Sequence, residues 1–122
     1  MNLTETKNAL VEALEDAGWP VKPFVPSNVQ PPLVIVTPDD PYITEGDTFG
    51  GDVLNVNLEV YVLPKVGQNS REVADLDRML DALIPRFGDW SVEVSRPEIY
   101  TLQTNLYYGA KVSTSHPFTL SA

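Results

Sequence analysis

Residues 53–63, with the sequence VLNVNLEVYVL, alternate between apolar side chains and polar or amphipathic ones. The even positions are Leu or Val, whereas Asn55, Asn57, Glu59 and Tyr61 occupy odd positions. Because successive side chains of a strand point to opposite faces, this alternation predicts a long strand with one buried face. Pro64 follows at once and cannot donate a hydrogen bond to a sheet, so the strand should end at residue 63. The chain must therefore build a sheet with a core on one side.

A second apolar run, Leu33–Val36, is bracketed by prolines at positions 31, 32 and 38, which predicts a short buried strand over residues 33–37. The glycine-containing stretch 38–52 follows and is expected to form a long acidic loop or a hairpin tip. No Lys or Arg occurs from Pro23 through Pro64. The acidic residues of that span are Asp39, Asp40, Glu45, Asp47, Asp52 and Glu59.

The remaining elements follow from caps and periodicity. Asn2 with Glu5, and Asn69 with Glu72, have the spacing of a capping box, and apolar residues recur at helical period behind each pair. They predict helices over 3–17 and 70–83. Alternation predicts strands over 90–95 and 106–113. Residues 98–105 could be strand or loop. Residues 20–32 are expected to form an extended crossing segment. The order of elements indicates a single α+β domain, residues 1–122. We expect one mostly antiparallel or mixed sheet of four to five strands, with two helices on one face.

Composition narrows the classes of function. The chain has no cysteine, and its 17 acidic and 8 basic residues give a net charge of −9. The basic residues are scattered singly, which disfavours direct, tight binding of nucleic acid. The first residues lack the pattern of a signal peptide, and no apolar stretch approaches the length that crosses a bilayer, so no membrane association is expected.

Candidate catalytic groups are few. His116 is the single histidine of the chain, and the interpretation we favour is an exposed or capping residue near a turn. The acidic loop lacks the D-x-D-x-D-G spacing of an EF-hand, and Gly50-Gly51 lacks the Lys and Ser/Thr of a phosphate-binding loop. We therefore predict no enzyme activity, no catalytic residue, no cofactor and no metal site.

Contacts with other subunits are the alternative use of these residues. Tyr61, Tyr100 and Tyr107 could be ordinary surface tyrosines or contact area for neighbouring subunits, where Tyr is favoured. The candidates for contacts on the sheet face are Asn55, Asn57, Tyr61 and Tyr107. The candidates for an interface or lumen loop are Asp39, Asp40, Tyr42, Glu45, Asp47 and Asp52.

The order of elements, the proline-bracketed strand, the glycine-rich acidic loop and the late strand Tyr107-Tyr108-Gly109-Ala110-Lys111-Val112 together resemble the tail-terminator and tail-completion proteins of long-tailed bacteriophages. The resemblance implies a virion structural protein, assembled in the host cytoplasm. It implies a homo-hexameric ring that caps the tail tube and joins it to the head, with the tail tube protein and the head-neck connector proteins as partners. No short motif carries named functional residues onto this chain.

If the resemblance holds, the acidic loop is expected at the lumen or at the ring edge, where DNA passes nearby without tight binding. Three other hypotheses about function stay open at this point. The chain could be a head-completion or neck connector protein, a small-molecule-binding α+β module or hydrolase unrelated to virions, or a cytoplasmic interaction adaptor of another bacterial system.

Overall fold

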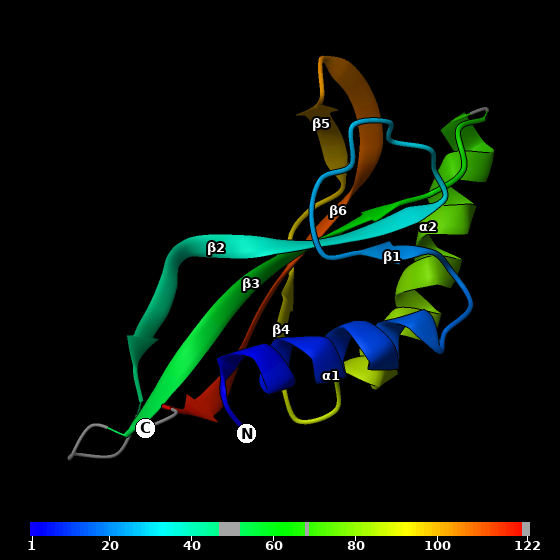
Figure 1. Ribbon diagram of the computed structural model, residues 1–122. Coiled ribbons are helices and arrows are strands. Elements are labelled where there is room, and N and C mark those ends of the chain that lie inside the picture. The colour runs from blue at the N-terminus through cyan, green and yellow to red at the C-terminus, as the bar shows by residue number, and fades with distance from the viewer. Residues whose placement is uncertain (47–51, 68, 121–122) are drawn as a thin grey trace.

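The computed structural model describes residues 1–46, 52–67 and 69–120. Within them the chain forms two α-helices, one 3-10 helix and six strands (Figure 1). In chain order these are α1 (Leu3–Glu15), β1 (Val21–Lys22), β2 (Leu33–Glu45), β3 (Val53–Leu63), α2 (Asn69–Leu83), η1 (Ile84–Phe87), β4 (Ser91–Val94), β5 (Glu98–Leu102) and β6 (Asn105–Thr119).

The strands form one mixed sheet in the order β1-β2-β3-β6-β4, and β5 pairs with the first part of β6. Only the β1–β2 pairing is parallel among the described strands. The predicted α+β class with two helices is therefore confirmed. The sheet has more strands than expected, because the crossing segment contributes the two-residue β1 and residues 98–102 form β5.

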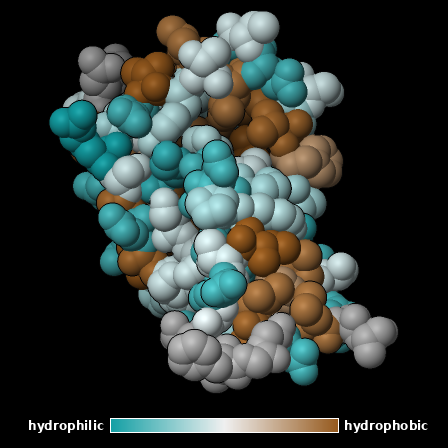
Figure 2. Space-filling model, turned by 90° about the vertical axis from the view of Figure 1, so that its left-hand side faces the viewer, coloured by the Kyte–Doolittle hydropathy of each residue, from teal (hydrophilic) through white to brown (hydrophobic). Residues whose placement is uncertain are grey.

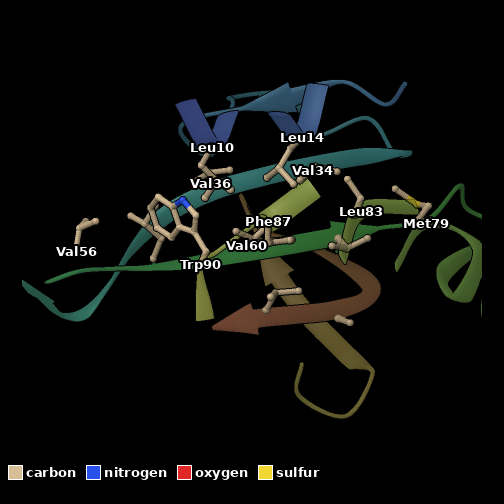
Figure 3. Packing of buried hydrophobic residues seen from close by; sticks show 14 of the residues in the cluster. Leu10, Leu14, Val34, Val36, Val56, Val60, Met79, Leu83, Phe87 and Trp90 are labelled. Carbon is tan, nitrogen blue, oxygen red and sulfur yellow. The ribbon is translucent and has the colours of Figure 1, made fainter. Parts of the chain in front are cut away.

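The main core lies between one face of the sheet and both helices. Leu10 and Leu14 of α1 point toward Val34 and Val36 of β2, as Figure 3 shows. The even-numbered residues of β3 from Val56 to Val62, with Ala110, Val112 and Phe118 of β6, complete this buried face. α2 and η1 cover it with Leu76, Met79, Leu83 and Phe87. The alternation of residues 53–63 therefore has the predicted cause, which is a helical layer on one side.

The opposite face is covered only at one end. A smaller cluster of Val29, Leu33, Ile35 and Leu63 lies there, with Tyr61, Leu102 and Tyr107 packed against it. The segment before β2 and the β5–β6 hairpin supply this cover. Leu33 and Ile35 are buried on the face opposite Val34 and Val36, so the first part of β2 is buried on both faces, as a continuous apolar run indicates.

The prediction of a loop over residues 38–52 is wrong for residues 38–45, which continue β2. The β2–β3 register shifts between Pro38, which pairs with Leu58, and Ile43, which pairs with Val56. The four residues Asp39–Tyr42 thus lie opposite the single residue Asn57 and form a bulge of four residues against one. Proline lacks the N–H that a regular ladder needs, so the strand bulges here and then resumes. Asp47 lies outside the described residues.

Smaller corrections concern the ends of elements. α1 ends at Glu15, two residues before the predicted boundary, and α2 begins at Asn69. β4 covers Ser91–Val94 within the predicted strand 90–95. β6 extends to Thr119 rather than 113, because β3 pairs with it up to Thr119, whereas β4 pairs with it only up to Ser115. Beyond that point β6 is an edge strand, where Pro117 needs no ladder donor on its free side.

Candidate functional site: the uncovered face of the sheet

Beyond the small cluster, the face of the sheet away from the helices is polar. Cross-strand pairing places Thr37, Glu59, Ser113 and Glu93 in one row across β2, β3, β6 and β4. A second row joins Asn57 of β3, Ser115 of β6 and Ser91 of β4. We call this surface the open face. It presents hydroxyl and carboxylate groups side by side on four neighbouring strands.

Glu59 is the centre of the hydrogen-bonded groups on the open face. Its Oε1 lies 3.4 Å from the Lys111 ammonium, and its Oε2 accepts a hydrogen bond of 3.3 Å from the Tyr61 hydroxyl. Both members of the ion pair are partly buried, with 31% and 23% of the Lys111 and Glu59 side chains exposed. Lys111 is thus neutralised, and it does not give the open face a free positive charge.

Tyr61 packs edge-on against Tyr100 of β5, with ring centroids 5.2 Å apart. The Tyr61 side chain is half-buried, so only part of it is exposed for contact with another subunit. Burial, followed by the neighbouring Glu59 carboxylate, raises the pKa of Tyr61 from 10.0 to about 12. Both effects act in the same direction because each disfavours a phenolate at this position.

The raised pKa predicts a loss of stability in alkali. The unfolded chain releases the Tyr61 proton near pH 10.0, whereas the folded protein holds it until about pH 12, so the contribution is complete below pH 10 and is lost as the pH rises through 12. We expect this loss to be only about 1 kcal/mol, because water screens a half-buried group, and Tyr61→Phe should abolish it. Urea unfolding of both proteins at pH 8 and at pH 11 measures the loss of stability in each. Equal losses in the two proteins would show that Tyr61 is not responsible.

A hollow of about 280 Å³ lies on the open face at the β2 bulge. Ser91, Ser113 and Ser115 line it, together with Asn57 and the two carboxylates Asp39 and Glu93. Ser91 and Ser115 hydrogen-bond to one another, with 2.8 Å between their hydroxyl oxygens. The hollow is wide and shallow, and its polar groups are hydroxyls, carboxylates and the Asn57 amide.

The predicted sheet-face residue Asn57 has a structural role. Its side-chain amide donates to the Pro41 carbonyl at 3.1 Å and to the Thr44 hydroxyl at 3.2 Å, so it bridges the bulge. Asn55 likewise lies near the backbone of β2, 3.5 Å from the Glu45 carbonyl. These two amides hold the outer half of β2 onto β3, and their donors point to β2 rather than to solvent.

The candidate residues of the acidic segment do not lie together. Asp39 lines the hollow, while Glu45 and Asp52 are exposed at the far end of the β2–β3 hairpin, and Asp40 is exposed at the bulge. Tyr42 turns toward α1, where its hydroxyl accepts a hydrogen bond of 2.7 Å from the Lys7 ammonium. Tyr107 is half-buried, and its hydroxyl donates to the Val29 carbonyl at 3.1 Å.

Sequence reasoning missed the surroundings of His116. Its Nε2 lies 3.1 Å from an Asp89 carboxylate oxygen, and its Nδ1 lies 2.6 Å from the Pro117 carbonyl. Its ring packs against Trp90 at a tilt of 34°, with 5.0 Å between centroids. The hydrogen bond from His116 lowers the pKa of Asp89. These contacts tie the turn before β4 to β6. Residues 27 positions apart form the pair, so no local pattern could reveal it.

In the part of the chain that the structure describes, no group of three or more His, Asp or Glu side chains is arranged to hold a metal ion. Among the same residues, no helix has the length and apolar character that would let it cross a membrane. No protein-family model matches this chain, and no curated protein is similar to it in sequence.

Proposed function

We propose that this protein is a structural component of a phage virion, which forms a ring at the head-proximal end of the tail. The ring ends growth of the tail tube and joins the tail to the head. The proposed partners are further copies of this chain, the tail tube protein and the head-neck connector proteins. DNA passes through the ring without being held.

The open face is the observation that supports this proposal. Among the described residues of its two cross-strand rows the carboxylates are Glu59 and Glu93, with Asp39 beside them at the hollow, and the neighbouring ammonium of Lys111 is paired with Glu59. A protein that retains DNA does so with several free Lys and Arg groups on phosphates, and each such contact releases counterions. A surface of hydroxyls and carboxylates offers no such contact and repels a passing duplex. It therefore suits a lumen wall.

The chain contains no cysteine, so a single introduced thiol can report where the open face lies in an assembly. Glu93→Cys places the thiol at the rim of the hollow, and Glu12→Cys places it on the exposed side of α1. Both variants remove one exposed carboxylate, so they are matched in charge. Each would be labelled with maleimide-linked gold and imaged by negative-stain microscopy, alone and with the tail tube protein.

We expect rings of about six subunits, with gold in the lumen for Glu93→Cys and on the outer wall for Glu12→Cys. Genes for tail tube and capsid proteins should lie next to this one. Gold from Glu93→Cys on the outer wall, or the absence of rings even with the tail tube protein present, would contradict the proposal.

A further inference from the structure

We propose that the free edge of β4 binds an extended segment of another protein, which joins the sheet as a further strand and places basic side chains beside Glu93. β4 is the last strand in the order β1-β2-β3-β6-β4, so β6 covers one of its two edges and the other is open. The partner is a different protein and binds a single copy of this chain. The inference therefore goes beyond the proposed ring and does not depend on it.

The pairing of β4 with β6 determines which backbone groups of β4 point outward. The Ser95 amide donates to the Lys111 carbonyl at 2.9 Å, so the odd-numbered residues of this segment direct their N–H and C=O groups to β6. These groups alternate in direction along an antiparallel strand, so those of Val92 and Val94 point away from β6. No other described segment supplies a backbone partner for these four groups.

The free edges of β2 and β6, in contrast, are protected against a further strand. In the outer half of β2, Pro38 has no N–H to donate, and the bulge follows it. At the end of β6, Pro117 has no N–H either, and its carbonyl lies 2.6 Å from Nδ1 of His116. The Thr119 amide next to it donates to the Met1 carbonyl. An added strand would find few free main-chain partners at these two edges.

β4 has no such protection. Its sequence, Ser-Val-Glu-Val, contains no proline, and its pairing with β6 has no bulge. Val92 and Val94 are β-branched, which favours an extended backbone. Pro97 interrupts the edge before β5, so a bound segment of about five residues matches the length that β4 offers. In strand addition of this kind, main-chain hydrogen bonds provide affinity and alternate side chains provide specificity.

The hollow of the open face determines which side chains the partner needs on that side. Glu93 of β4 lines the hollow, and Asp39 lines it at the β2 bulge. Glu59 is neutralised by Lys111, whereas no ion pair of Glu93 or Asp39 is formed among the described residues. Every second side chain of an added strand would lie on the open face next to Glu93. A Lys or Arg there would form a cross-strand pair of opposite charge.

The other side chains of the added strand should be apolar. Val92 and Val94 lie on the side of the sheet that the helices cover, and Val94 packs against the main core. The residues opposite them would extend this apolar surface. Figure 2 shows that the middle of the side of the molecule away from α2 is largely hydrophilic, which agrees with a polar open face. The partner segment therefore alternates between basic and apolar residues.

Charge argues against a second copy of β4 as the occupant. Two β4 strands paired in antiparallel register about Glu93 would bring their two Glu93 carboxylates side by side, which costs free energy. The chain also carries a net charge of −9, so it repels its own copies and attracts a basic partner. A basic segment of a different protein has neither disadvantage.

A peptide probe tests the inference directly. The purified, ¹⁵N-labelled protein would be titrated with the peptide acetyl-Lys-Val-Lys-Val-Lys-amide and followed by NMR. We expect saturable shifts of the Val92 and Val94 amide signals, and slower exchange of these two amides with solvent, because both become hydrogen-bonded. The absence of saturable shifts at Val92 and Val94 with millimolar peptide would overturn the inference.

Two matched peptides distinguish strand addition from simple attraction of charge. N-methylation of both valines keeps the charge of the peptide but removes the N–H groups that would pair with β4, and should weaken binding about tenfold or more. A peptide with Glu in place of each Lys keeps the N–H groups but reverses the charge, and should also bind about tenfold or more weakly. Equal binding of the N-methylated peptide would overturn the inference.

Glu93→Gln tests the proposed charge pair in the protein itself. It should weaken binding of the basic peptide about fivefold, because the side chain keeps its shape and loses its charge. Glu98→Gln is the matched control, because Glu98 is an exposed carboxylate of β5 that does not line the hollow. Equal affinities of the two variants would overturn the assignment of Glu93. Because these measurements use the single chain, they give their answer whether or not rings form.

Discussion

Phe87→Ala should lower the free energy of unfolding by about 3–5 kcal/mol. Phe87 is the last residue of η1 and is 2% exposed, packed in the main core between the helices and the sheet. Its removal would leave a cavity that neighbouring side chains cannot fill, because α1, α2 and β3 are fixed around it. The cost comprises the lost burial of an aromatic ring and the lost contacts of the cavity walls.

Urea denaturation followed by circular dichroism measures this change, and the thermal midpoint should fall by more than about 10 °C. Phe24→Ala is the matched control, because Phe24 is 57% exposed in the segment before β2. The control should change the free energy of unfolding by less than about 0.5 kcal/mol. A loss below about 1 kcal/mol for Phe87→Ala would mean that η1 is not part of the cooperative core.

Gly109→Ala has the second largest expected effect, about 2–3 kcal/mol of lost stability. A Cβ at this position would collide with the Val62 carbonyl oxygen and would lie 2.8 Å from Cδ2 of Leu63. Val62 cannot move away, because β3 is paired on both sides, with β2 and with β6. The close approach occurs where β6 leaves β3, since Ala110 is its last partner on that strand and Gly109 already pairs with Glu98 of β5.

Gly67→Ala is the control for that substitution. The nearest atom to a Cβ on Gly67 is Cδ of Arg71, at 3.9 Å, which is an ordinary contact with a flexible side chain. We expect a change below about 0.5 kcal/mol for the control. Hydrogen exchange of the β5 and β6 amides would show whether Gly109→Ala loosens the hairpin that covers the small cluster. Wild-type stability and exchange in this variant would refute the steric argument.

The elements that were predicted correctly depend on interactions between residues that are close together in the chain. The alternation of β3 and the capping box at Asn2 and Glu5 act between residues at most three positions apart, and both are present in the structure. Asn55, Asn57 and Tyr61 lie on the face of β3 away from the main core, because the period of two fixes the side of every residue once one face is known.

The parts that could not be predicted depend on distant residues. The bulge at Asp39–Tyr42 is bridged by Asn57, which follows Pro41 by 16 positions, so residues 38–45 read as a loop when taken alone. Tyr107 is covered because Val29, 78 residues earlier, lies against it. His116 lies beside Asp89 because the pairing of β4 with β6 brings the two residues together. Tertiary packing decides all three, and no short window of sequence contains both partners.

The bulge in β2 also determines how the length of this segment can vary. It adds three residues relative to β3, so Pro38 and Ile43 both lie opposite inward-facing residues although one is even-numbered and the other odd. The bulge thus takes up an odd number of extra residues without exchanging the two faces of the outer hairpin. A change of one residue within 39–42 should therefore leave Ile43 opposite Val56, in the hollow that it lines with Leu3 and Phe118. The length of the chain can vary at this point while the pairing of β2 with β3 on both sides of it is kept.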